Sequence, residues 1–473
     1  MASKNITFES VPASIRKPGK YFEFNTALAV RTLPANAQLV LVVAQRLAAG
    51  SVPALTPVNV FSDVEAAGYF GQGSVAHRMV RALLTCYAYL DVTVIAVDDD
   101  AESIAAAGAV TITGPATGSG LVTLYVGADK VQVAAEAADT ATEIAAALAA
   151  KAAQQPDLPV TFSVAAGVIT ITAKNKGALG NQIPLAAVCE APGVTAAVTA
   201  MTNGAANPSI ADALAAVFAS GHDVIVTPYN DQTSLTALRT HLDAVGGPME
   251  QRGAVGVYAT TGTLAAATTL AGQINSGRIT GGLLPGTRSL SCEVAAAYAA
   301  RVAYEEDPAR PLNTLALTGI DAPPVESRLS RTEQENVLRN GVTPLEVGPG
   351  DVVQIVRAIT TYTVDAQGIE DPALLDLTTI RTLDYVRYAC RQRISLRFPR
   401  EKLSARTPAK VRSELLDVLF KLEELEIIEE VEANKDGVLV ERDGQDVNRL
   451  NAKIPCDVVN GLHVFAGRID LLL

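Results

Sequence analysis

The sequence predicts a multidomain protein that combines α+β and α/β architecture. At 473 residues the chain is longer than one hydrophobic core ordinarily supports, so about two to four domains are expected. Helical and strand patterns alternate between residues 210 and 305, which is typical of a three-layer α/β domain. No arginine occurs between Arg81 and Arg239, where Gly, Ala and Thr dominate, and this change of composition indicates a separate insert.

The composition excludes several classes of protein. The net charge of −12 is opposite to the cationic surface that nucleic acid requires, so no direct nucleic-acid partner is expected. The five cysteines are scattered without a CxxC or Cys/His cluster, so we expect free thiols, with neither a zinc site nor a disulfide framework. The N-terminus lacks the apolar run of a signal peptide, and no stretch reaches the ~18 apolar residues of a membrane span. We therefore expect a soluble, cytosolic protein without membrane insertion.

Six segments follow from these changes of pattern. The expected boundaries are 1–30 for an N-terminal arm, 31–97 for the first part of the α/β region, 98–205 for an inserted β-rich domain, 206–325 for an α/β domain, 326–460 for a C-terminal α+β core domain and 461–473 for a C-terminal arm strand.

The first three segments contain strands of alternating or continuous apolar residues and two helices. Ser74 is a plausible N-cap for the first helix, and Thr140 with Glu143 has the spacing of a capping box at the start of the second. The expected strands are 21–30, 38–44, 91–97, 109–113, 121–126, 160–164 and 168–173, and the expected helices are 74–90 and 140–153.

The second half of the chain reads as alternating helices and strands, followed by two long helices and hairpins. Asn340-Gly341 is typical of a left-handed helix end, and two Asp-Gly turns indicate tight hairpins near the C-terminus. The expected helices are 210–219, 231–245, 262–275, 291–305, 331–339, 376–395 and 407–422; the expected strands are 223–227, 254–259, 278–284, 351–363, 437–442, 447–455 and 461–472.

The sequence contains few motifs that are typical of enzymes. The turn at 71–74 precedes a helix but is neither GxGxxG nor a P-loop, and Ser291-Cys292-Glu293 lacks a GxSxG elbow or a partnered histidine. The four histidines are far apart and show no metal-binding spacing. We therefore expect no catalytic, cofactor-binding or metal-binding residues, and no cofactor.

Both chain ends are apolar. An apolar strand at a free end favours aggregation unless it is paired, so each end is either an edge strand of its own domain or a strand added to a neighbouring subunit. The candidate arm residues are Tyr21, Phe22, Phe24, Leu28, Val30, Leu462, Val464, Phe465, Ile469 and Leu471.

A charge inversion lies near residue 413. Ten Arg and Lys residues between 381 and 412 precede eight acidic residues between 414 and 432. Helical spacing places Arg381, Asp384, Arg387 and Arg391 on one face. Such runs are either solvated helix faces or complementary surfaces in a head-to-tail polymer. The candidate basic face comprises Arg381, Arg387, Arg391, Arg393 and Arg397.

Several segments resemble contractile phage tail sheath proteins, in particular the Mu-like branch. These segments are Asn336–Val342 with its Asn-Gly-Val end, Val352–Tyr362 (VVQIVRAITTY), Leu383–Arg387 (LDYVR), Ser14–Asn25 (SIRKPGKYFEFN) and Tyr69–Ser74 (YFGQGS). The resemblance covers most of the chain, and none of its motifs is an enzymatic signature.

The resemblance implies a core sheath domain formed by both chain ends, from which the α/β domain and the β-rich insert project. It further implies stacked hexameric rings around a tail tube, with arms that pair with neighbouring subunits and the basic helix at 381–397 facing the tube. The implied partners are other copies of the chain, the tail tube, the baseplate and the tail terminator. An α/β enzyme centred on 210–305 and a surface adhesin remain the alternative functions.

Overall fold

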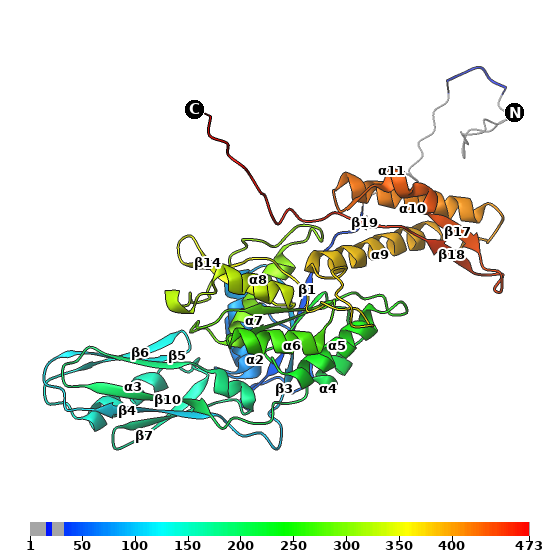
Figure 1. The fold of residues 1–473 in the computed structure, drawn as a ribbon. Helices are drawn as coiled ribbons and strands as arrows, with labels where there is room; N and C mark the ends of the chain where they lie inside the picture. Colours follow the sequence, from blue (N-terminus) through cyan, green and yellow to red (C-terminus); the bar gives the residue numbers. More distant parts are fainter. Residues whose placement is uncertain (1–15, 21–32, 473) are drawn as a thin grey trace.

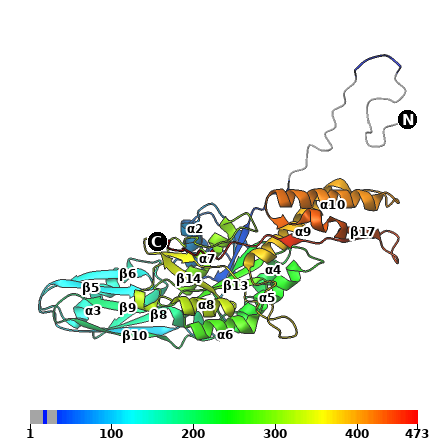
Figure 2. The same ribbon diagram turned by 45° about the horizontal axis from the view of Figure 1, so that its top comes forward.

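The computed structural model describes residues 16–20 and 33–472. The inserted domain lies at one end of the molecule, a large mixed sheet with its helices forms the centre, and two long C-terminal helices lie at the other end (Figures 1 and 2). This arrangement agrees with the mixed α/β class expected from the sequence.

The centre is an eight-stranded sheet in the order β15-β14-β13-β12-β11-β1-β3-β2. All neighbours from β3 to β14 pair in parallel, whereas β2 and β15 are antiparallel edge strands. The strands are β1 (Leu39–Gln45), β2 (Val58–Asn59), β3 (Asp91–Val97), β11 (Val224–Val226), β12 (Val255–Thr260), β13 (Ile279–Leu283), β14 (Thr343–Gly348) and β15 (Val352–Ile355).

Helices cover both faces of this sheet, as the alternating pattern predicts. The cluster containing α2 and α7 packs on one side of β1, through Val40 and Val42, and the cluster containing α4 and α5 packs on the other, through Leu41 and Val43. Ser74 accepts the backbone N–H of His77 and caps α2 as expected. The helices are α1 (Asp63–Phe70), α2 (Val75–Cys86), α4 (Ala211–Ala216), α5 (Gln232–Gly246), α6 (Leu264–Ile274), α7 (Ser291–Tyr304) and α8 (Arg331–Arg339).

The inserted domain interrupts the central sheet between β3 and β11. It has its own hydrophobic cluster, and its two ends meet at the bridge between Ile104 and Ala205. The expected capping box of Thr140 and Glu143 is present. Its elements are β4 (Ala107–Thr113), β5 (Gly120–Val126), β6 (Asp129–Ala135), α3 (Ala141–Ala153), β7 (Val160–Ala165), β8 (Val168–Ala173), β9 (Leu185–Cys189), β10 (Thr195–Thr202) and the short 3-10 helix η2 (Ala178–Gln182).

The central sheet extends past residue 325, where the sequence places the end of the α/β domain. The proline-rich stretch at 308–324 is a connection within the domain, because Leu317 N–H donates to Val353 O at the sheet edge. After the short 3-10 helix η3 (Val325–Ser327), α8 ends as expected, with Gly341 at φ +73°.

The strand expected at 351–363 ends at Ile355, so this prediction is wrong in its second half. Residues beyond it run through the interior without a ladder. Thr361 N–H donates to Ile279 O at 2.8 Å, and Thr360 N–H donates to Leu375 O at 2.7 Å. Buried backbone groups are therefore satisfied by loop contacts instead of strand pairing.

The C-terminal part consists of two long helices and small sheets around a separate hydrophobic cluster. Leu33 packs against this cluster, and Tyr385 Oη donates to Pro34 O at 2.8 Å. The elements are α9 (Leu377–Arg397), α10 (Thr407–Glu424), α11 (Val431–Asn434), the 3-10 helix η4 (Lys435–Gly437), β16 (Ile428–Glu429) paired with β19 (Asp457–Val458), and β17 (Leu439–Arg442) paired with β18 (Leu450–Lys453).

Candidate assembly surfaces

The C-terminal segment runs away from the body as an extended chain (Figure 1). Residues 459–472 belong to no strand, although the sequence predicts one at 461–472. Within the described residues this segment is therefore not an edge strand of its own subunit. The candidate arm residues here are strongly exposed: Leu462 at 81%, Val464 at 79%, Phe465 at 88%, Ile469 at 99% and Leu471 at 83%.

One side chain of this segment is enclosed. His463 is 14% exposed and lies against Asn313, in the connection after α7, and Asp376, which precedes α9. The sequence gives no signal for this contact, since the partners are distant along the chain. The N-terminal arm residues Tyr21, Phe22, Phe24, Leu28 and Val30 lie outside the described residues.

The basic run on α9 is largely engaged within the subunit. Arg381 and Arg393 are 6% and 5% exposed, so the prediction that they contribute to a surface face is wrong. Arg381 donates to Glu305 O, and burial lowers its pKa to about 10. Arg393 donates to both Glu414 and Asp417 of α10.

The helical face predicted from Arg381, Asp384, Arg387 and Arg391 packs on the subunit's own α/β domain. Asp384 accepts two hydrogen bonds from Arg278, at 2.6 and 3.0 Å. Arg387 donates to Gly246 O at 2.8 Å and to Asp384 at 2.8 Å, and Arg391 lies 3.4 Å from Gln251 Oε1. Arg391 nevertheless remains exposed.

The acidic block after residue 413 also finds partners inside the subunit. Arg397 Nε lies 3.5 Å from Glu414, and Lys421 lies 3.2 Å from Asp417. The charge inversion in the sequence is thus partly neutralised between α9 and α10. The sequence pattern of a single helix could not predict these ion pairs, because their partners lie about twenty residues away on another helix.

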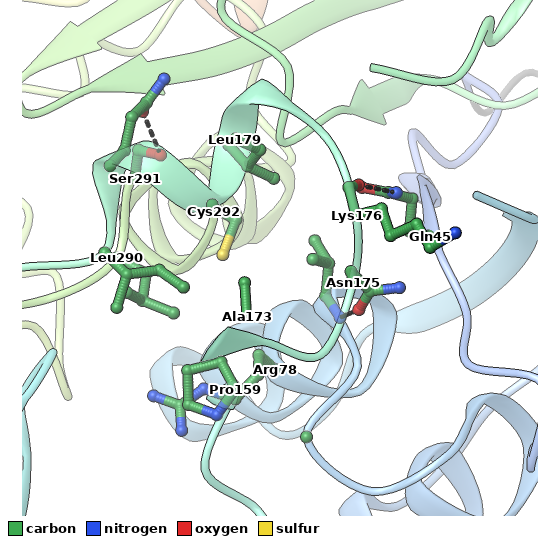
Figure 3. A pocket seen from close by; sticks show the side chains of 15 residues that line it. Gln45, Arg78, Pro159, Ala173, Asn175, Lys176, Leu179, Leu290, Ser291 and Cys292 are labelled. Carbon is green, nitrogen blue, oxygen red and sulfur yellow. Dashed lines mark hydrogen bonds between the residues drawn. The ribbon is translucent and has the colours of Figure 1, made fainter. Parts of the chain in front are cut away.

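The junction between the inserted domain and the central sheet contains a second group of polar contacts, which surrounds a small cavity (Figure 3). Gln45 donates to Lys176 O at 2.7 Å, and Ser291 Oγ donates to Gln182 Oε1 at 2.9 Å. The cavity between them measures about 30 Å³, enough for about one or two water molecules. Cys292 lines it, and burial raises the pKa of this thiol to about 12, so the nucleophilic thiolate is not populated near neutral pH.

A buried ion-pair cluster fastens this junction. Arg78 on α2 pairs with Asp129 of the inserted domain and, at 2.6 Å, with Glu293 on α7. The Arg78 side chain is 2% exposed, and both carboxylates raise its pKa despite the opposing effect of burial. The sequence did not identify this cluster, because its members are separated by fifty residues or more.

The sites considered for enzymatic chemistry carry structural contacts. Asp231, after β11, caps α5 by accepting Ser234 N–H at 2.9 Å, and Asn230 donates to Gln182 Oε1 at 2.9 Å. In the turn before α2, Gly73 N–H donates to His77 Nδ1 at 3.0 Å. Within residues 16–20 and 33–472, no group of three or more His, Cys, Asp and Glu side chains could hold a metal ion. No described helix is long and apolar enough to cross a membrane.

Comparison with protein families finds two domain models that match this chain. Residues 203–361 match the phage tail sheath protein central domain, and residues 370–471 match the phage tail sheath C-terminal domain. The chain therefore belongs to the phage tail sheath proteins, and it is a structural subunit of a contractile phage tail.

The resemblance to the Mu-like branch is confirmed over the whole chain. The Mu-like prophage FluMu tail sheath protein of Haemophilus influenzae is 33% identical over 489 aligned positions, which cover 99% of this chain and 100% of the relative.

Two solved structures of sheath proteins are similar to this chain, and the first of them shows the fold. The sheath complex of an extracellular contractile injection system, PVC, in its contracted state is 11% identical with a TM-score of 0.51, and the match covers 97% of this chain and 98% of that chain. The sheath tail protein Lin1278 of Listeria innocua is 14% identical with a TM-score of 0.49, covering 92% and 94% of the two chains.

Proposed function

We propose that this subunit polymerises as stacked hexameric rings around a tail tube and that contraction of the lattice drives the tube through the host envelope for DNA delivery. Its partners are other copies of itself, the tail tube protein, the baseplate and the tail terminator. It assembles in the host cytoplasm and acts in the virion. The observation that carries the proposal is the exposed, unpaired C-terminal segment of a chain that aligns with a tail sheath protein over 99% of its length.

The arm acts by adding a strand to a neighbouring subunit. Six of its apolar side chains are at least 79% exposed, which is unfavourable in a soluble monomer and favours a partner. Strand addition would satisfy the arm's backbone groups and place alternate side chains in pockets of the neighbour. Phe465, Ile469 and Leu471 share one face at period two, and Val464 and Arg468 share the other.

A suitable acceptor exists in the C-terminal domain. β17 and β18 form a two-stranded sheet, and neither has a second strand neighbour among the described residues. The hairpin packs on the C-terminal hydrophobic cluster through Val440 and Leu450, and an added strand would extend its sheet. Flexible arms paired with such edges would keep subunits joined while their bodies rotate.

Contraction would draw its energy from new subunit contacts. The subunits would be assembled on the tube in a metastable packing, and a signal at the baseplate would release them into a packing that buries more surface. Such a mechanism requires no nucleotide hydrolysis by this chain. The family membership and the exposed C-terminal segment support this contraction mechanism.

Electron microscopy of the purified protein, with its size-exclusion profile, tests the proposal. We expect hollow tubes or stacked rings, and removal of residues 464–473 should leave a folded monomer that forms none. Ile469→Asp should also suppress polymers, whereas Arg468→Gln on the opposite strand face should not. Tubes formed by the truncated chain would contradict the arm mechanism.

The tube-facing role of α9 is tested separately. Arg391 is exposed, so Arg391→Glu should weaken co-assembly with the tail tube protein if this end of the helix faces the tube. Arg400→Glu, in the turn after α9, is the matched exposed control. Equal co-assembly by wild type and both variants would remove α9 from the tube interface.

A further inference from the structure

His463 is enclosed in a segment that is otherwise exposed. Its side chain is 14% exposed, whereas Leu462 and Val464 on either side are 81% and 79% exposed. In an extended chain neighbouring side chains point in opposite directions, so a single enclosed residue fixes one point of the backbone without covering its neighbours. His463 therefore marks where the C-terminal arm leaves the body.

The one hydrogen bond that the ring makes within the described part of the chain indicates its tautomer. Asn313 Nδ2 lies 3.0 Å from His463 Nδ1. An amide nitrogen can only donate, so Nδ1 accepts and the ring proton resides on Nε2. Nε2 lies 3.5 Å from Asp376 Oδ1, but no hydrogen bond joins the two atoms, and Nε2 is buried without a hydrogen-bond partner among the described residues.

Both partners are themselves held in place. Asp376 accepts two hydrogen bonds from Arg357, at 2.8 and 2.7 Å. Next to Asn313, Thr314 N–H donates to Ile355 O of β15 at 2.8 Å. The ring thus lies between the connection that is bonded to the sheet edge at Thr314 and the residue that precedes α9.

The backbone two residues earlier approaches the same surface. A Cβ added at Gly461 would lie 2.6 Å from Pro311 Cγ and 2.8 Å from His463 Nε2. Only glycine allows this close approach without displacement of a neighbour.

We propose that His463 is a latch that seats the base of the C-terminal arm on the α/β body, so that the hinge of the arm lies between residues 463 and 464. The latch fixes the point and direction from which residues 464–473 reach a neighbouring subunit. It also couples the arm base to rotation of the α/β body. The inference concerns the geometry of the arm and rests on the proposed role of that arm in assembly.

The charge state of the ring agrees with this geometry. Burial lowers the pKa of His463, the nearby Arg357 lowers it further, and Asp376 raises it. The charged groups that face the ring are these two, from the loop after β15 and from the residue preceding α9. The ring is therefore neutral near pH 7, as the acceptor role of Nδ1 requires.

Nitrogen NMR of the full chain with labelled histidine tests the latch directly. The chain has four histidines, so the spectrum contains few ring-nitrogen signals. The signals that disappear in His463→Gln belong to His463. We expect a single neutral Nε2–H tautomer for His463 in the wild type, and tautomer averaging in Asn313→Ala. An averaged signal in the wild-type monomer, or an Nδ1–H tautomer, would overturn the proposal.

Assembly supplies the functional measurement. His463→Ala should fold normally but raise the critical concentration for polymer formation about two- to tenfold, the range of one net hydrogen bond, because a free arm base must be ordered on pairing. His241→Ala, a half-buried histidine on α5, is the matched control and should be neutral.

The two proposals fail differently. Polymers from the chain lacking 464–473 would refute the arm mechanism. Loss of polymers in that truncation, with His463→Ala indistinguishable from His241→Ala, would retain the arm and refute the latch.

Discussion

Arg393 on α9 lies 3.1 Å from Glu414 on α10 and donates a hydrogen bond to it through Nη1. The same nitrogen also donates to Asp417, one turn further along α10. The Arg393 side chain is 4% exposed, so this charge is carried inside the helical pair. The two long helices of the sheath C-terminal domain are consequently joined by a buried ionic contact as well as by apolar packing.

Replacing Arg393 should therefore destabilise the C-terminal domain. Arg393→Ala is expected to cost about 3 kcal/mol of unfolding free energy, the low end for breaking a buried pair, because the two carboxylates are partly exposed. Thermal and urea denaturation measure it. Arg400→Ala, at an exposed position just after α9, should change stability little. Equal stability of the two variants would show that the pair contributes nothing.

The approach of α9 to the α/β domain depends on Gly253. A Cβ added there would lie 2.1 Å from Asp384 Cγ and disturb its pair with Arg278. Gly253→Ala should lower the unfolding free energy by about 1–3 kcal/mol. Gly272→Ala in α6, where a Cβ meets nothing within 4 Å, should instead be stabilising by about 0.5–1 kcal/mol. Denaturation of both variants makes the comparison, and a neutral Gly253→Ala would contradict it.

The pH dependence of the unfolding free energy should reflect the raised pKa of Asp223. Burial raises its pKa to about 6 from the ordinary 3.8. The folded state therefore binds the proton more tightly, and this stabilising contribution is complete below pH 3.8 and lost as pH rises through about 6. Asp223→Asn keeps an acceptor for Leu39 N–H and should be more stable than wild type near pH 7, with the difference vanishing near pH 4. A constant difference across that range would contradict this assignment.

The junction of the inserted domain should loosen when Arg78 is replaced. Arg78→Met leaves Glu293, whose side chain is 9% exposed, without its nearest cation. Hydrogen exchange should accelerate in β6, which carries Asp129, while the central strand β12 stays protected. Arg81→Met is the control, because Arg81 is 28% exposed and its ion pairs span 3.6–4.0 Å. Similar exchange in both variants would show that Arg78 does not fasten the junction.

Local patterns predicted most helices and most strands of the central sheet, but neither β2 nor β14. Ser74, Thr140 and Glu143 act as the caps expected of them, because capping needs only neighbouring residues. The strand β14 was missed because its sequence TPLEVG contains Pro and Gly, and it is held at the sheet edge by β13 and β15.

The parts that sequence could not predict depend on contacts between distant residues. Arg381 and Arg393 read as surface charges on one helix, yet partners on other segments bury them. His463 gave no signal, because Asn313 lies 150 residues away. The apolar composition of residues 461–472 left an edge strand and an arm as alternatives, and neither the exposure of this segment nor the point at which it leaves the body could be predicted from it.

The bridge between Ile104 and Ala205 brings the entry and exit of the inserted domain together. β1 pairs with β3, which precedes the insert, and with β11, which follows it, so the insert contributes no strand to this part of the sheet. A foreign module with adjacent ends could therefore replace the insert without a change of strand order, if it supplied an acid in place of Asp129 for the buried Arg78. Sheath lattices built from such chains would display a guest domain once per subunit.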